Sequence, residues 1–327
     1  MKDVGLVGPP FSGKSTLFTA LTRAGAAGGR SNQAVVPVPD TRLGVLTELE
    51  RSRKTVPAQV RFVDVPGGTT AQGVAELRVT DALAVVLRAF GPDADPAKDW
   101  EGVAAELLLA DLAVVDSALE NARRRAKGRS GGGGPEVESL ERAHAALSDE
   151  RPLRDVGFGA EDLAHLRSLA ALTLKPWIPV ANLEEGAEVP AGVPEGTVPV
   201  FASIEAETAG MAEEEARELL AEFGVTEPGL DRVVAASYRA LDLITFLTTG
   251  EDETRAWEVR SGATAPDAAG VIHTDLQRGF IRAEVVGYDD LVAAGGWNAA
   301  KSKGLLRVEG KDYVVREGDV MHVRFNV

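Results

Sequence analysis

The sequence predicts an α/β fold that is interrupted by a long helical hairpin and followed by a small α+β module. Three observations support this prediction. Short apolar runs typical of buried strands recur through residues 4–87 and 177–203, a helical apolar repeat fills much of residues 100–147, and short strand-like runs alternate with helical pieces at the end of the chain. The expected division is an α/β domain from residues 1–92 and 172–240, an inserted helical domain from 93–171 and a C-terminal domain from 241–327.

The glycine-rich stretch of residues 8–16 matches the P-loop pattern G-x-x-x-x-G-K-S. Residues 4–7 before it are apolar, as in a buried strand, and residues 15–22 after it carry apolar side chains at helical spacing. A strand, loop and helix in this order present backbone N–H groups, a helix N-terminus and a lysine to phosphate. We therefore expect a nucleotide phosphate site formed by Gly8, Pro9, Pro10, Phe11, Ser12, Gly13, Lys14, Ser15 and Thr16.

A second motif, D-x-P-G, follows the strand-like residues 60–63 and runs from Asp64 to Gly67. In a P-loop protein, a carboxylate at this place completes the Mg²⁺ shell, and the glycine N–H meets the γ-phosphate. We expect Ser15 and Asp64 to hold Mg²⁺. Lys14 and Gly67 are expected to act in catalysis by contacting the phosphates.

The motif N-L-E-E at residues 182–185 ends the strand-like run of residues 177–181, where P-loop GTPases specific for guanine carry N-K-x-D. Leu183 replaces the lysine and Glu185 the aspartate, which disfavours selective binding of guanine. We expect Asn182, Leu183 and Glu185 to hold the base, with Ser203 beside it after the next strand.

The middle of the chain predicts a coiled-coil hairpin. From Trp100 onward, apolar residues alternate at spacings of four and three until a glycine-rich break at residues 130–135, after which the repeat resumes. A basic cluster lies near the predicted tip. It indicates either a contact with RNA or an ordinary solvated face. The cluster contains Arg123, Arg124, Arg125, Lys127 and Arg129.

The last part of the chain reads as a β-grasp module. An acidic helix at residues 211–223 and a short helix through 238–246 are expected before it. Two helical pieces, 265–275 and 289–303, should lie between its strands. Five strands are expected: residues 255–259, 280–286, 306–309, 313–315 and 320–327.

Composition excludes several classes of function. The 327 residues include no cysteine, which rules out disulfides, thiolate metal sites and cysteine nucleophiles, and the four histidines are scattered. The net charge of −15 argues against a protein that coats nucleic acid over its whole surface. No apolar run approaches a membrane span, so we expect a cytoplasmic protein that makes no membrane contact. A monomer is the expected oligomeric state, which the sequence itself leaves open.

Taken together, these motifs resemble the YchF-type Obg-like ATPases. The likeness rests on the P-loop, D-x-P-G, N-L-x-E, A-S-I-E-A-E at 202–207, and a C-terminal series that includes R-A-W, G-A-T-A-P, G-V-I-H-T-D, G-F-I-R-A-E and R-F-N-V. It covers nearly the whole chain. The resemblance implies an Obg-class nucleotide domain, an inserted helical domain and a C-terminal TGS domain. It also implies a preference for ATP over GTP, slow hydrolysis and association with ribosomes or ribosomal RNA as a regulator.

Three positions depart from the family pattern. Phe11 stands where the family has an asparagine that helps to hold a monovalent cation in related proteins, which argues against activation by K⁺. Residues 25–40, at the place of the first switch, contain no threonine for Mg²⁺. Gly68, the residue after D-x-P-G, has no side chain to orient a water.

The leading hypothesis is an Obg-like nucleotidase that hydrolyses ATP, with GTP as the other candidate, and regulates ribosomes by its nucleotide state. One alternative is a nucleotide-gated adaptor that binds ribosomes or RNA with little or no hydrolysis. A small-molecule kinase is a third possibility, although D-x-P-G and a TGS-like tail have no use in such an enzyme.

Overall fold

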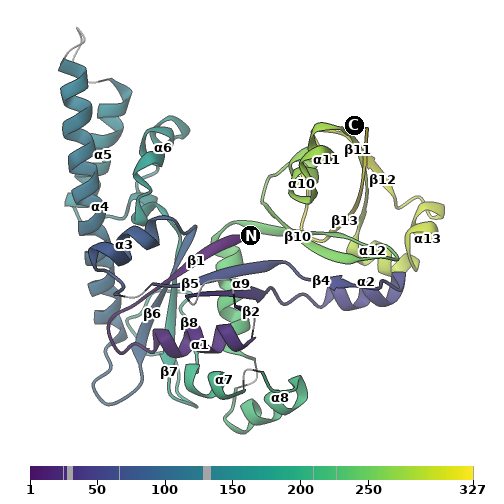
Figure 1. The fold of residues 1–327 in the computed structure, drawn as a ribbon, viewed down its shortest axis with the longest axis horizontal. Helices are drawn as coiled ribbons and strands as arrows, with labels where there is room; N and C mark the ends of the chain where they lie inside the picture. Colours follow the sequence, from purple (N-terminus) through teal and green to yellow (C-terminus); the bar gives the residue numbers. More distant parts are fainter. Residues whose placement is uncertain are drawn as a thin grey trace. The chain divides into compact units, whose positions relative to one another are not determined.

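The computed structural model describes residues 1–24, 26–27, 32–65, 67–127, 134–208, 210–225 and 227–326. The chain divides into two units, each drawn in Figure 1. The larger unit comprises Lys2–Val36 and Arg61–Val233, and the smaller unit comprises Met1, Pro37–Val60 and Val234–Val327. Within the described ranges, no helix is long and apolar enough to cross a membrane.

A seven-stranded sheet forms the core of the larger unit, with parallel pairing of β1 with β6, β6 with β7 and β7 with β8. The first six residues of β6 are all buried, as expected for a strand covered on both faces. The carboxyl ends of the parallel strands share one edge of the sheet, where ligand sites form. In spatial order the strands are β2 (Ala26–Ala27), β3 (Gln33–Pro37), β5 (Gln59–Asp64), β1 (Lys2–Val7), β6 (Ala82–Ala89), β7 (Trp177–Leu183) and β8 (Val198–Val200).

Helices connect these strands and extend into the hairpin. The predicted hairpin is present: α4 is a single helix of 32 residues, and α5 packs along its second half around a core that includes Val115, Leu119 and Leu140 (Figure 1). The helices are α1 (Lys14–Ala24), α3 (Ala71–Arg78), α4 (Pro96–Lys127), α5 (Pro135–Ser148), α6 (Ala160–Leu166), α7 (Ala202–Thr208), α8 (Glu213–Glu222) and α9 (Gly229–Ala240), with short 3₁₀ turns at Leu153–Asp155, Arg167–Leu169 and Leu172–Leu174.

The first half of α4 belongs to the sheet as much as to the hairpin. Val103 and Leu107 are buried in the cluster that contains Leu83, Val85 and Leu87 of β6. One continuous helix therefore runs from the face of the sheet into the projecting hairpin, and its early residues lie close to the ends of the strands.

A six-stranded sheet forms the smaller unit, and helices pack on it around a core that includes Phe246, Val285 and Met321. The strand order is β12 (Arg307–Glu309), β11 (Phe280–Gly287), β13 (Asp319–Phe325), β9 (Leu243–Thr248), β10 (Thr254–Arg260) and β4 (Thr55–Val56). The helices are α2 (Arg42–Glu50), α10 (Ala265–Ile272), α11 (Thr274–Arg278), α12 (Tyr288–Ala294) and α13 (Trp297–Ser302).

The smaller unit corrects two predictions. The prediction of a short helix through residues 238–246 was wrong in its second half. The chain turns at Asp242 (φ 52°), and Leu243–Thr248 forms β9, which pairs with β10. The strand expected at 313–315 is reduced to an isolated bridge between Val314 and Thr264. Each expected helical piece between the strands is also split into two helices.

The segment Pro37–Val60 groups with the C-terminal segment rather than with the rest of the N-terminal part of the chain. Its β4 pairs with β10, and Arg53 N donates to Glu251 O at 3.0 Å. The domain boundaries expected from the sequence, at residues 92, 171 and 240, stay a prediction.

Candidate functional site

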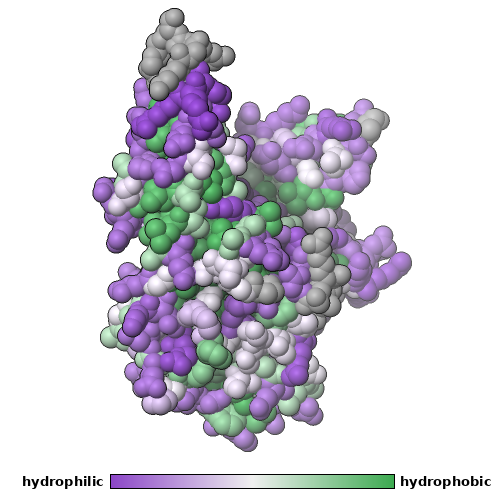
Figure 2. Space-filling model, turned by 60° about the vertical axis from the view of Figure 1, so that its left-hand side comes forward, coloured by the Kyte–Doolittle hydropathy of each residue, from purple (hydrophilic) through white to green (hydrophobic). Residues whose placement is uncertain are grey.

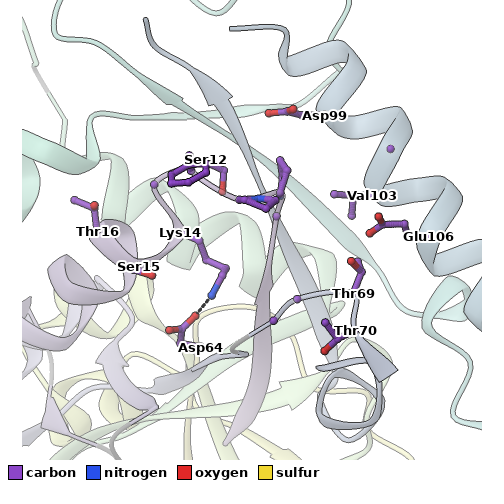
Figure 3. Close-up of a pocket in the computed structure, with 18 of the residues that line it drawn as sticks. Ser12, Lys14, Ser15, Thr16, Asp64, Thr69, Thr70, Asp99, Val103 and Glu106 are labelled. Carbon is purple, nitrogen blue, oxygen red and sulfur yellow. Dashed lines mark hydrogen bonds and ion pairs between the residues drawn. The ribbon is translucent and has the colours of Figure 1, made fainter. Parts of the chain in front are cut away.

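A cavity of about 950 Å³ lies against the loop between β1 and α1 (Figure 3). It brings together the P-loop, the D-x-P-G segment and one face of α4, three stretches that are far apart in the sequence. Its lining consists of Gly8, Pro9, Pro10, Phe11, Ser12, Gly13, Lys14, Ser15, Thr16, Asp64, Gly67, Gly68, Thr69, Thr70, Lys98, Asp99, Gly102, Val103 and Glu106.

Two P-loop glycines are required by close approaches of other atoms. A Cβ on Gly8 would lie 2.4 Å from the Val86 carbonyl oxygen. Gly13 has φ +83°, and a Cβ there would lie 2.0 Å from Asn182 Nδ2. Only glycine satisfies both the conformation and the space at such a position, so the loop is held close to β6 and β7.

Asn182 holds the P-loop in place through a side-chain hydrogen bond. Its side chain is almost fully buried at the end of β7, where Nδ2 donates to the Ser12 carbonyl oxygen at 3.1 Å. Its Oδ1 accepts from the Ala202 N–H, also at 3.1 Å. The first residue of the N-L-E-E motif therefore joins the P-loop to the start of α7, a structural role that the sequence did not indicate.

Lys14 and Asp64 face each other across the floor of the cavity. The Lys14 ammonium forms an ion pair with the Asp64 carboxylate and lies 3.4 Å from the Val65 carbonyl oxygen (Figure 3). A nucleotide phosphate would pair with Lys14 and a metal ion with Asp64, so binding of both would replace this ion pair.

The residues present fit a magnesium ion. Ser15 offers a hydroxyl at the first turn of α1, and Asp64 offers a carboxylate at the end of β5, with both lining one cavity. Mg²⁺ usually keeps several waters and takes only one or two carboxylates plus phosphate oxygens. No cluster of three or more acidic, histidine or cysteine side chains is present in the described residues, and a site of this kind needs none.

The segment after Asp64 contributes two glycines to the cavity lining, followed by Thr69 and Thr70. Gly67 and Gly68 both have positive φ, +77° and +48°. The Thr70 hydroxyl then caps α3 by accepting from the Gly73 N–H at 3.3 Å. Gly67 therefore lies in the cavity lining just before a capped helix, and contact of its N–H with a phosphate stays a prediction.

One face of α4 forms the remaining wall, and the sequence analysis missed it. Lys98, Asp99, Gly102, Val103 and Glu106 line the cavity at spacings of one helical face (Figure 3). The heptad pattern indicated only a hairpin, and nothing in it showed that the first turns of α4 pack beside the P-loop. Helix α4 therefore lines the cavity with its first turns and forms one arm of the hairpin with its later turns.

The residues expected at the base lie outside this cavity lining. Leu183 is 4% exposed, so its side chain packs in the protein interior. Glu185 and Ser203 are exposed. The neighbouring Glu184 accepts from the Gly91 N–H at 3.2 Å. Contact of Leu183, Glu185 and Ser203 with a base stays a prediction.

Phe11 is unusual for its position. It has φ 66°, in the left-handed region, and is 88% exposed at the mouth of the cavity. Its aromatic ring offers no ligand atom for a monovalent cation. Part of the predicted first switch lies outside the described residues, which exclude Gly25 and 28–31.

Two partly buried basic side chains, Arg78 and Lys175, hold the C-terminal end of α3 in place. Arg78 donates to the Asp111 carboxylate of α4 at 2.7 Å, and this carboxylate, fully buried, also accepts from the N–H groups of Leu172 and Thr173. Lys175 donates to three backbone carbonyl oxygens, those of Leu77, Arg78 and Thr80. Burial lowers the pKa of Lys175 to about 8.

The basic cluster of the hairpin is neutralised locally. Arg123 pairs with Glu141 at 2.7 Å, Arg124 with Glu120 at 3.5 Å and Arg125 with Glu136 at 2.7 Å. All of these side chains are well exposed, so the pairs are weak and can be exchanged for other partners. The side chain of Lys127 and the whole of Arg129 lie outside the described part of the chain.

Two family models match the chain. One, described as a 50S ribosome-binding GTPase, matches residues 3–113 and so includes the P-loop and D-x-P-G. The other is YchF-GTPase_C, described as a protein of unknown function, and matches residues 243–326. Together they match segments from both units.

Full-length relatives agree with these matches. The "Ribosome-binding ATPase YchF" of Haemophilus influenzae is 41% identical over 358 residues, and that of Bacillus subtilis is 40% identical over 361 residues, with 99% of each chain covered. The solved Schizosaccharomyces pombe YchF GTPase superposes with a TM-score of 0.88 at 29% identity, covering 99% of this chain and 97% of the other. The alignments exceed the 327 residues of this chain, so they contain gaps in it. The resemblance drawn from the motifs is confirmed, and the chain belongs to the YchF family.

Proposed function

We propose that this protein binds ATP with Mg²⁺ at the P-loop cavity, hydrolyses it slowly, and changes its association with ribosomes according to the bound nucleotide. The observation that carries the proposal is the cavity itself, where a lysine, a hydroxyl, a carboxylate and the glycine-rich loop line one space after a buried strand. Relatives that align over the full length are named ribosome-binding ATPases, which supports both ATP and the ribosome.

Each residue has a defined part in this proposal. Lys14 and the loop backbone hold the phosphates, and the Gly67 N–H contacts the γ-phosphate. Ser15 and Asp64 hold Mg²⁺, which supplies charge neutralisation on the phosphate oxygens when bound. The base is held by the segment from the end of β7 to the start of α7, through Asn182, Leu183, Glu185 and Ser203. Slow turnover follows because Gly68 leaves the position after D-x-P-G without a side chain.

Turnover of ATP tests this proposal directly. Purified protein with ATP and Mg²⁺, with and without ribosomes, should release phosphate above a Lys14→Ala control. Titration of nucleotide-free protein with ATP and GTP at two K⁺ concentrations should show tighter binding of ATP and no effect of K⁺. Phosphate release equal to that of the Lys14→Ala variant in every condition would contradict the enzymatic part.

Gly68 also favours a second candidate, a nucleotide-gated adaptor whose hydrolysis is vestigial. An adaptor would bind ATP with the same residues and still respond to it, but would show no turnover above the Lys14→Ala control. Binding and turnover measured on the same preparation therefore separate the two functions. In either case we propose action in the cytoplasm, as a monomer, without membrane contact.

A further inference from the structure

Three carboxylates line the nucleotide cavity in the described part of the chain, and they differ in their partners. Asp64 forms an ion pair with Lys14. Asp99 accepts from the Arg88 backbone N–H at 2.9 Å. Glu106 is exposed to the cavity, and no hydrogen bond or ion pair joins its carboxylate to another described residue. Glu106 is therefore the one acidic side chain of this lining whose carboxylate has no hydrogen-bond or ion-pair partner among the described residues.

Glu106 also lies where a second cavity adjoins the first. A groove of about 670 Å³ between α3 and α4 is lined by Val74, Leu109 and Val114, and it shares Glu106, Thr69 and Thr70 with the nucleotide cavity. Leu109, in the lining of this groove, is 65% exposed. Figure 2 shows hydrophobic residues gathered on the surface of the larger unit below the hydrophilic end of the hairpin. The shared residues therefore form a junction between this groove and the D-x-P-G end of the nucleotide cavity.

The junction adjoins the residue where a water-orienting side chain is missing. Gly68 and Thr69 both line the cavity, and Thr70 already uses its hydroxyl to cap α3. Hydrolysis of a nucleotide needs a group that orients the attacking water, and Gly68 cannot supply one. A carboxylate repels phosphate in direct contact, but it binds well to a water placed between the two.

We propose that Glu106, on α4, orients the attacking water in place of the missing side chain at position 68. The inference rests on the ATPase function proposed above. The water oxygen forms a bond to the γ-phosphorus while the bond from that phosphorus to the bridging oxygen breaks. ADP leaves with the electron pair, and the proton of the water ends on the released phosphate. Glu106 accepts a hydrogen bond from the water and emerges unchanged.

Single-turnover hydrolysis of ATP tests the role of Glu106. The Glu106→Ala variant should lower the rate by about 10²-fold, the scale expected when a reacting group loses the residue that positions it. Its affinity for ATP should stay at the wild-type value, because Glu106 touches water rather than nucleotide. Glu106→Gln keeps an acceptor oxygen at the same distance and should restore most of the rate. Glu101→Ala, an exposed acid on the same helix outside the cavity, is the matched control.

The outcomes separate this inference from the function it rests on. Wild-type turnover no faster than that of Lys14→Ala would overturn the proposed function and this inference with it. Turnover above that control, together with a Glu106→Ala rate equal to wild type, would overturn only the role of Glu106. A Glu106→Gln rate as low as that of Glu106→Ala, or an equal loss in Glu101→Ala, would do the same.

Discussion

At the scale of single residues, the P-loop conformation depends on a neighbour from a distant strand. The amide of Asn182 lies against the Cα of Gly13 and donates to the carbonyl oxygen of Ser12. The motif therefore specifies a loop whose shape is completed by a side chain about 170 residues later. Sequence reasoning assigned Asn182 to the base, because a motif reports residue types and not the contacts that bury them.

Replacement of Gly13 by alanine tests this packing. The new Cβ would overlap Asn182 Nδ2 at 2.0 Å and force the residue to keep a positive φ, so we expect the loss of ATP binding and a lower free energy of unfolding. Gly91→Ala is the matched control, because Gly91 has φ +79° with no atom within 4 Å of a new Cβ. That change should cost only about 1–2 kcal/mol from backbone strain and leave ATP binding intact. Equal effects of both substitutions in ATP titration and urea unfolding would contradict the account.

At the scale of elements, α3 is held at its C-terminal end and begins at the phosphate end of the cavity. Arg78 joins it to α4 through Asp111, and Lys175 caps its last carbonyl groups. A change at Gly67 or Gly68 on nucleotide binding would therefore reach the hairpin through a fixed contact. Such a link couples the two elements only if the buried pair is strong.

The Asp111→Asn variant measures the strength of this link. Arg78 would lose its charged partner in a site where the Asp111 side chain is fully buried, so the free energy of unfolding should fall by about 3 kcal/mol. Asp116→Asn, at a 61% exposed position on the same helix, should cost less than about 1 kcal/mol. Urea unfolding checks both values. Similar losses in free energy of unfolding for the two variants would show that the buried Asp111 pair stabilises the protein no more than an exposed one.

Lys175 makes this contact at the end of α3 dependent on pH. Burial lowers its pKa from 10.5 to about 8, so between these values the unfolded chain binds more protons than the folded one. The contribution of Lys175 to stability is therefore present in full above pH 10.5 and is lost as the pH falls through 8. The difference in free energy of unfolding between wild type and Lys175→Met should grow from pH 7 to pH 10. A difference that stays constant with pH would contradict the lowered pKa.

The elements themselves were mostly predictable from local patterns. The P-loop, the strands of the larger sheet and the hairpin follow from motifs and apolar periodicity. The β9 strand was missed because Leu243–Thr248 continues an apolar run directly after α9, and only its pairing with β10 decides between helix and strand. The α4 wall of the cavity was missed because Lys98 and Glu106 look like solvated positions until the helix is placed beside the P-loop.

At the scale of the whole molecule, the charge distribution limits how the protein can meet a ribosome. The net charge is −15, and Arg123, Arg124 and Arg125 are each paired with a glutamate. General attraction to RNA is therefore weak. Binding has to depend on specific surfaces, and the proposed function makes it depend on the nucleotide as well. Exposed ion pairs of this kind cost little to exchange, so the hairpin tip can still release its arginines to a partner.

Sedimentation with ribosomes in the presence of ATP, ADP or no nucleotide tests the central claim most directly. Wild-type protein should pellet with ribosomes to different extents in the three conditions, because the proposed function requires nucleotide at the P-loop to act on α3 and, through the contact of Arg78 with Asp111, on the hairpin. The Lys14→Ala variant should pellet to one extent whatever nucleotide is added. Wild-type pelleting that is the same in all three conditions, or absent from all of them, would contradict the account.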